Sequence, residues 1–227
     1  MEDDPATHGG LRLVDVVVAG HRGDAGTARR ALVSDDPRLR EVALGALARA
    51  GDLEPSTVER MLREDPDAGV RRRACDLAAT FHPSGSLLSA LREALGDPDA
   101  LVVEAACWAL GESSSAPVED LVRTARSHPD ARAREAAIAA IGGVGDPRGL
   151  PAVLGALEDR PTVRRRAVVA LAAFDGEEVQ AALRRSADDR DWQVREVADI
   201  LLDAAPAPGA QGGGSPDDAE TEEGDSA

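Results

Sequence analysis

Two runs of three arginines, at residues 71–73 and 164–166, are the side chains of this sequence that could bind an anion. Guanidinium groups donate paired hydrogen bonds to phosphate or carboxylate oxygens. The first run follows the turn Asp65-Pro66-Asp67 and precedes an alanine-rich segment, so it lies near the start of a predicted helix. Whether such arginines bind a ligand or a carboxylate of the same chain depends on the elements that position them.

The histidines and serines do not form a recognisable metal or catalytic site. His8, His21, His82 and His128 fall in four separate turns or termini, without the spacing of zinc ligands. The serine-rich turn "GESSSAP" lacks the pattern of a nucleophile elbow, and "GGVGDPRG" lacks the preceding strand that a phosphate loop requires. We therefore expect no metal, no cofactor and no catalytic residue.

The composition favours closely packed helices. Of 227 residues, 43% are hydrophobic but only 2% are aromatic, so Ala, Leu, Val and Ile must build the core. The net charge is −16, but 10 of the 42 acidic residues lie in residues 2–4 and 203–227. The remaining 32 acidic residues against 26 basic ones, all Arg, leave a net charge of −6, which argues against nucleic acid as the main partner.

The sequence contains no apolar segment of the roughly 18–20 residues that cross a bilayer. Its start, "MEDDPATHGG", is acidic, whereas the n-region of a signal peptide is basic. We expect a cytoplasmic protein that does not enter a membrane.

One nine-residue pattern occurs six times. It reads "LREVALGAL" from Leu39, "VRRRACDLA" from Val70, "VVEAACWAL" from Val102, "AREAAIAAI" from Ala133, "VRRRAVVAL" from Val163 and "VREVADILL" from Val194. Its fifth place is always alanine, at spacings of 31, 32, 31, 30 and 31 residues: Ala43, Ala74, Ala106, Ala137, Ala167 and Ala198. Such regularity indicates a repeat array.

Each repeat predicts two helices. The apolar first, fifth, eighth and ninth places form a helical stripe, and an aspartate stands three residues before the first place as an N-cap in every unit except the fifth, where Arg160 replaces it. We call this predicted helix B. A shorter amphipathic run precedes each B helix, and we call it helix A. Because one hairpin cannot bury its apolar stripe alone, neighbouring hairpins must stack.

The two ends of the array differ from its middle. Residues 11–24 match the end of a unit, with Asp15 in place of the alanine, and predict a degenerate N-terminal cap. Glu196, Asp199 and Asp203 make the last B helix polar enough to close the stack. The residues beyond it lack the apolar content needed to fold.

These units resemble HEAT repeats, specifically the short phycobilisome-lyase-like kind with the pattern D-x-x-V-R-x-x-A-x-x-A-L-G-x-x-G-D. The resemblance implies an all-α fold, an α-α superhelical solenoid of about six hairpins in which B helices line a concave face. The expected division is a disordered acidic N-terminus at 1–10, a HEAT-repeat solenoid at 11–203 and a disordered acidic tail at 204–227. Deoxyhypusine hydroxylase, an enzyme of HEAT repeats, holds iron through His-Glu pairs, and no histidine here is followed by Glu.

A helical wheel separates the arginines into two groups. Arg71 and Arg73 fall at the margins of the buried stripe, and Arg72 points outward. The margin arginine recurs as Arg40, Arg71, Arg134, Arg164 and Arg195, while Val103 takes its place in the third unit. Each except Arg164 stands four residues after a capping aspartate, and we expect the two to pair, in an ion-pair ladder similar to the one that joins units in the family. Cys75 and Cys107, both at the sixth place, are expected to be small core residues rather than a disulfide.

Two outward columns form the expected concave surface. The third place alternates in charge, so it offers no basic stripe. The seventh place holds three apolar residues near the solvent edge. These residues could be a binding hot spot, or they could fill the space between B helices. A solvated polar face is the other interpretation of the charged column. The expected contact residues are Glu41, Arg72, Asp76, Glu104, Trp108, Glu135, Arg165, Val169, Glu196 and Ile200.

Three functions fit these features. The first is a monomeric, non-enzymatic adaptor that binds another protein on its concave face. The resemblance also implies a tetrapyrrole-attachment lyase or its chaperone, although no pigment pocket is identifiable in the sequence. A DNA glycosylase of HEAT-like repeats is the third, but the alternating charges argue against the cationic groove that it needs. Trp192, just before the last B helix, is expected to pack as part of the cap.

Overall fold

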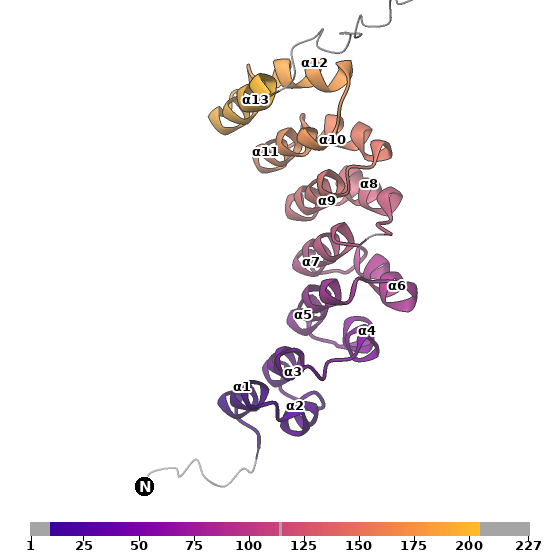
Figure 1. Ribbon diagram of the computed structural model, residues 1–227, viewed down its shortest axis with the longest axis vertical. Helices are drawn as coiled ribbons and strands as arrows, with labels where there is room; N and C mark the ends of the chain where they lie inside the picture. The colour runs from indigo at the N-terminus through magenta and orange to yellow at the C-terminus, as the bar shows by residue number, and fades with distance from the viewer. Residues whose placement is uncertain (1–9, 114, 205–227) are drawn as a thin grey trace, which may run out of the picture.

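The computed structural model describes residues 10–113 and 115–204, and these residues form helices and no strands (Figure 1). Helices of two series alternate along the chain and stack in two columns. The prediction of an all-α solenoid of six hairpins preceded by a cap helix is confirmed. The expectations for residues 1–9 and 205–227 lie outside the described residues.

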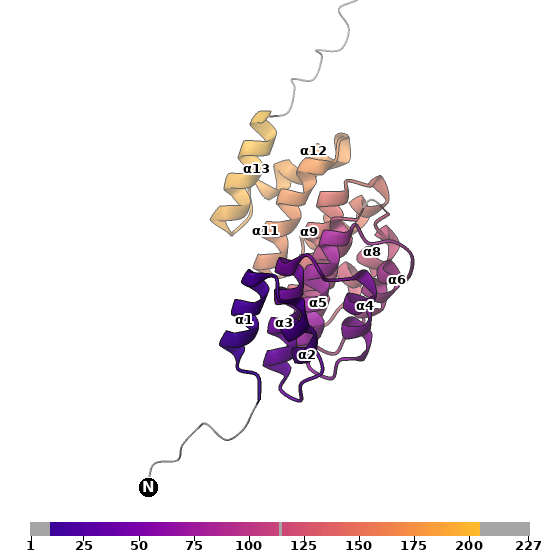
Figure 2. The ribbon, with the colours of Figure 1, turned by 60° about the horizontal axis from the view of Figure 1, so that its bottom comes forward.

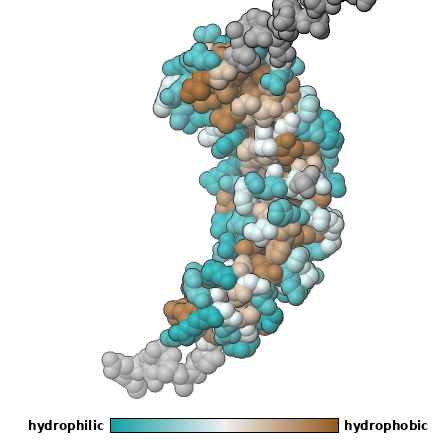
Figure 3. Space-filling model, in the orientation of Figure 1, coloured by the Kyte–Doolittle hydropathy of each residue, from teal (hydrophilic) through white to brown (hydrophobic). Residues whose placement is uncertain are grey.

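The B series forms one column and begins with the cap helix. Its members are α1 (Leu13–Arg22), α3 (Pro37–Ala50), α5 (Ala68–Ala78), α7 (Ala100–Gly111), α9 (Ala131–Val144), α11 (Pro161–Ala170) and α13 (Trp192–Ala204). Figure 2 shows the B helices side by side when the molecule is turned. The outline of the molecule is bowed, and the B helices lie on its concave side (Figures 1 and 3).

The A series forms the other, convex column. Its members are α2 (Ala25–Ala31), α4 (Pro55–Glu64), α6 (Gly85–Ala94), α8 (Val118–Ser127), α10 (Leu150–Ala156) and α12 (Glu177–Ser186). Short 3₁₀ turns extend α5 (Ala79–Phe81) and α11 (Leu171–Ala173) and precede α10 (Pro147–Gly149).

Helix boundaries follow from local chemistry. The carboxylate of Asp36 accepts the backbone N–H of Arg38 at 2.9 Å, and Asp67 accepts that of Val70 at 3.2 Å. These bonds satisfy N–H groups that have no partner inside the helix. Arg160, which stands in place of the aspartate in the fifth unit, makes no side-chain cap, as the sequence predicts. At the other end, Gly51 takes a left-handed conformation with φ of +71°, which ends α3 and begins the turn to α4.

The alanine column forms the centre of a single elongated core. All six alanines at the fifth place have no exposed surface. Small residues also let successive B helices approach closely. A Cβ atom added to Gly142 of α9 would lie 2.8 Å from the Cβ of Ala170 in α11, which is closer than van der Waals contact permits. Neighbouring hairpins therefore depend on each other for burial, as expected for a solenoid.

Within residues 10–113 and 115–204, no helix is both long enough and apolar enough to cross a membrane.

Candidate protein-binding surface

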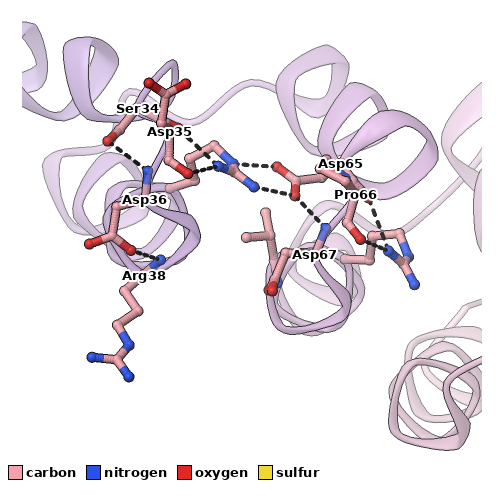
Figure 4. Close-up of polar contacts among 10 residues, drawn as sticks. Ser34, Asp35, Asp36, Arg38, Asp65, Pro66 and Asp67 are labelled. Atoms are coloured by element: carbon pink, nitrogen blue, oxygen red, sulfur yellow. Dashed lines mark hydrogen bonds and ion pairs between the residues drawn. The ribbon is translucent and has the colours of Figure 1, made fainter.

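A ladder of arginines and aspartates joins successive hairpins at their A–B loops. Arg40 of α3 donates two hydrogen bonds to Asp65, from Nε to Oδ2 at 2.7 Å and from Nη2 to Oδ1 at 2.8 Å. Its Nη1 donates to the carbonyl of Ser34 at 2.9 Å. Asp65 in turn accepts the backbone N–H of Asp67 at 3.0 Å (Figure 4). One side-chain pair thus joins the A–B loop of one hairpin to that of the next.

The expected pairing with the capping aspartate four residues earlier is wrong. The capping aspartate is engaged with the start of its own helix, whereas Asp65 lies at the C-terminal end of the next A helix, facing Arg40. The margin arginine therefore bonds to a residue about 25 positions ahead. The same bidentate contact recurs in Arg71–Asp97, Arg134–Asp159 and Arg164–Asp189.

The ladder lacks one rung, between α7 and α9. Val103 stands at the arginine position, and His128 stands two residues before Asp130, at the position of Asp65 relative to Asp67. Both members of this pair are thus replaced together, so neither charge is left in place without its partner. An ion pair between A helices crosses the same junction, with Arg92 Nε 2.6 Å from Asp120 Oδ2.

The ladder holds its carboxylates in the charged form. Burial by itself would raise the pKa of Asp65, but hydrogen bonds from Arg40 and the Asp67 amide outweigh burial and lower it. The pKa values of Asp97 and Asp189 are lowered by the same balance. For Asp159 the hydrogen bond from Arg134 is the largest effect, and it lowers the pKa. These groups serve the scaffold, because their hydrogen-bonding capacity is used inside it.

A groove of about 1050 Å³ lies on the concave face over α5, α7 and α9. Its floor is formed by small and apolar side chains of the three helices, among them Leu77, Ala105, Ala136 and Ala140. Charged side chains stand around the floor: Arg72, Arg73, Asp76, Glu104, Glu112, Arg132, Glu135 and Arg166. Four arginines against four carboxylates make the groove neutral overall, so it is not a cationic channel.

Trp108 and Asp76 are the most distinctive side chains of this groove. Trp108 of α7 is 50% exposed although it lies at the middle of the array. Asp76 of α5 is partly buried, and among the described residues it has no hydrogen-bond or ion-pair partner. Burial raises the pKa of Asp76, and the nearby Arg73 and Arg72 offset this only in part.

Five of the ten expected contact residues line this groove: Arg72, Asp76, Glu104, Trp108 and Glu135. The other five lie elsewhere along the concave face. Glu41 is 3.9 Å from Arg72, while Glu196 and Ile200 lie on α13 at the end of the array. Val169 is 46% exposed and borders a smaller hollow between α9 and α11.

Of two expectations for exposed side chains, one stays a prediction and one is wrong. Arg165 remains an expected contact residue, although its Nε donates to Asp191 Oδ2 at 2.8 Å, and its side chain is 43% exposed. The loop before α13 places that carboxylate next to α11, which the sequence of α11 could not show. Trp192 does not pack as part of a cap, since it is 61% exposed at the start of α13.

The sequence analysis missed two groove residues. Leu101 is 37% exposed beside Trp108, and Arg132 lines the groove from α9. Both stand one residue before the first place of the pattern. On the helical wheel that position lies next to the seventh place, so extending the wheel by one residue would have found them.

The groove does not contain a reactive thiol. Cys75 and Cys107 are free and completely buried in the core. Burial raises the pKa of the Cys107 thiol to about 12, and it raises that of Cys75 as well. Across the described part of the chain, no three His, Cys, Asp or Glu side chains come together in a group that could hold a metal ion.

The sequence matches the family model for HEAT repeats over residues 55–122 and 118–202, which is more than half of the chain. This chain belongs to the HEAT-repeat family. The matched residues of this HEAT-repeat protein run from α4 to α13 and include all three helices of the groove. No curated protein matches the sequence.

Solved structures of repeat proteins share the fold at low identity. The YibA protein of Escherichia coli superposes with a TM-score of 0.62 at 17% identity, covering 86% of this chain and 76% of that one. Designed armadillo repeat proteins for modular peptide recognition give 0.55 at 18% identity, covering 79% and 98%. The CpcE–CpcF complex of phycocyanin lyase from Nostoc gives 0.53 at 21% identity, covering 87% and 79%. At these identities the likeness is one of fold.

Proposed function

We propose that this HEAT-repeat protein is a non-enzymatic adaptor that binds another protein in the groove formed by α5, α7 and α9. The observation that carries the proposal is the exposed Trp108 above an apolar floor, surrounded by charged side chains. A central aromatic residue within a polar rim is the usual composition of a binding hot spot. The cytoplasmic location expected from the sequence belongs to the same proposal.

The groove also specifies what the partner should carry. An apolar side chain would lie against Trp108 and Leu101, where it would remove exposed apolar surface from water. A basic side chain next to it would reach Asp76, whose carboxylate has no partner among the described residues. Pairing would return to that carboxylate the stabilisation it lost through burial. The proposed partner segment therefore combines an apolar anchor with an adjacent Arg or Lys.

Nucleic acid fits this groove poorly, because the four carboxylates cancel the charge of the four arginines.

A tetrapyrrole-binding role remains as a second candidate, favoured by the fold shared with CpcE and CpcF of phycocyanin lyase. A groove of about 1050 Å³ has the volume of a large ligand site. Absorbance of a co-purified or added tetrapyrrole, lost in Trp108→Ala, would support that candidate against the adaptor.

The two tryptophans allow a site-specific test. In Trp192→Phe the remaining Trp108 reports on the groove, and in Trp108→Phe the remaining Trp192 reports on the end of the array. Peptides selected on the immobilised protein would be titrated against both variants. We expect peptide binding to shift the tryptophan fluorescence emission of Trp192→Phe and to leave that of Trp108→Phe constant.

Two substitutions then separate the groove from the rest of the surface. Trp108→Ala should weaken peptide binding about tenfold or more, whereas Trp192→Ala, which removes an even more exposed indole, should leave it unchanged. Selected peptides should contain the apolar anchor and the adjacent basic residue. Binding that survives Trp108→Ala would contradict the proposal.

A further inference from the structure

The repeat register shows which places of a B helix are covered by the preceding B helix. Taking the first residue of each nine-residue pattern as place one, the eighth place faces the preceding helix. Gly20 of α1 lies against Ala46 of α3, and Gly111 of α7 lies against Ala140 of α9, in both cases at the eighth place of the later helix. The eighth place is buried in α3, α5, α7, α9 and α11: Ala46, Leu77, Ala109, Ala140 and Ala170.

Helix α1 has no preceding helix among the described residues, and its corresponding face is apolar. With Leu11 aligned to Leu39, Val14 and Val18 occupy the fourth and eighth places, and they are 55% and 36% exposed. Leu13 and Val17, at the third and seventh places, are also exposed and extend the same face. Figure 3 shows apolar surface at the end of the molecule that α1 forms. Four neighbouring exposed aliphatic side chains on one short helix mark an interaction site.

The opposite end of the solenoid matches this face less well, because it carries more charge. The outer side of α13 presents Arg195, Asp199 and Asp203, beside the exposed apolar residues Trp192 and Ile200 of the same helix. Stacking that end onto α1 would bury carboxylates against valines, which is unfavourable. A head-to-tail array of copies is therefore less favourable than a contact between two α1 faces, because it would bury Asp199 and Asp203.

The first nine residues of the chain are also an unsuitable cover. Their sequence, "MEDDPATHG", has three acidic residues and Met1 as its one large apolar side chain. A face of four aliphatic side chains is best covered by an equally apolar surface. The same face of α1 in a second copy is such a surface.

We propose that two copies of this protein associate through α1, related by a two-fold axis, so that the apolar face of each α1 covers that of the other. Such a contact is isologous, because the same patch is used by both copies, and it closes at the dimer. It leaves both concave grooves open, so each dimer presents two partner sites. This inference replaces the monomer expected from the sequence, and it does not depend on the function proposed for the groove.

The area of the apolar face sets the expected affinity between the two copies. One ten-residue helix buries less than the roughly 1,200–2,000 Å² of a standard stable interface, so we expect a dissociation constant in the micromolar range rather than the nanomolar range. The net charge of −16 on each copy also opposes association at low ionic strength.

Sedimentation velocity of the full chain, from about 5 to 500 µM at roughly 0.15 M salt, tests the proposal. We expect the average mass to rise from 23.6 kDa and to level off at twice that value. Val14→Asp should raise the dissociation constant about tenfold or more, because it places a carboxylate in the contact. Val33→Asp changes a valine that is 79% exposed elsewhere on the surface, and it should leave the constant unchanged.

Circular dichroism should show that both variants keep their helices, and Val18→Asp serves as a second probe of the same face. A mass that stays at 23.6 kDa over the whole range would overturn the proposal. So would growth beyond the dimer, since a two-fold contact closes, or dimerisation that persists in both Val14→Asp and Val18→Asp.

Discussion

Arg40 and Asp65 belong to different repeats, yet they form a bidentate ion pair in which both side chains are largely buried, with 12% and 3% of their surface exposed. The same relationship recurs at three later junctions. These four pairs join each hairpin to the next at their junctions.

Asp65→Asn should destabilise the protein by about 1–3 kcal/mol, because the buried Arg40 guanidinium would lose its counter-charge. Urea denaturation followed by circular dichroism measures this change. Glu119→Gln is the matched control, since the pair of Glu119 with Arg148 is exposed and should contribute little. Equal effects of the two substitutions would show that the ladder is not a structural element.

The ladder also predicts acid sensitivity. Asp65, Asp97, Asp159 and Asp189 have pKa values below the ordinary 3.8, so the unfolded chain binds protons more readily than the folded one. Their contribution to stability is complete above the unfolded value and is lost as the pH falls through the lower, folded values. The free energy of unfolding should therefore decrease below about pH 4, and Asp65→Asn should reduce that slope.

Asp76 should behave in the opposite way. Its pKa is raised by burial, so its ionised form destabilises the folded state, and this cost is lost as the pH falls through the raised, folded value towards 3.8. Asp76→Asn should therefore raise the free energy of unfolding at pH 7, with the difference vanishing at low pH. Glu104→Gln, an exposed change in the same groove, is the control and should have little effect on stability. A stable Asp76→Asn variant that binds selected peptides less well would indicate that this carboxylate is kept for binding.

Gly142 and Gly143 are neighbours in α9, and we expect alanine substitutions at these two positions to change the stability in opposite directions. Gly142→Ala should destabilise the protein by about 1–3 kcal/mol, because the new Cβ would lie 2.8 Å from Ala170 and push α11 away. Gly143→Ala meets no atom within 4 Å and should stabilise the helix by about 0.5–1 kcal/mol. Thermal denaturation of the two variants compares them directly, and the same sign for both would contradict the close packing of α9 on α11.

The ion pair that is missing between α7 and α9 can be introduced by two substitutions. Val103→Arg alone should destabilise, because it replaces a completely buried valine with a cation that has no carboxylate to meet. Adding His128→Asp supplies the carboxylate at the position that Asp65 and Asp97 hold in their units. A double-mutant cycle should give a favourable coupling of about 1–3 kcal/mol between the two changes. Additive effects would mean that this junction differs in geometry from the others.

The sequence by itself determined the repeat, the two helices of each hairpin and the alanine column of the core. These features depend on local rules, namely helical periodicity, aspartate caps and glycine C-caps, and on a period that brings equivalent residues into register. The wheel also placed Arg72 outside and Arg71 and Arg73 at the margins, because burial on one helix follows from its own sequence.

The tertiary structure alone decided which side chains meet. Arg40 bonds to Asp65 rather than to Asp36, and Arg165 is held by Asp191, because those carboxylates come from the next hairpin, beyond the reach of a single-helix pattern. The curvature of the stack likewise gathers residues of α5, α7 and α9 into one groove and leaves Glu41 and Ile200 outside it. Contacts between repeats depend on how hairpins pack, and small differences at each junction add up along the array.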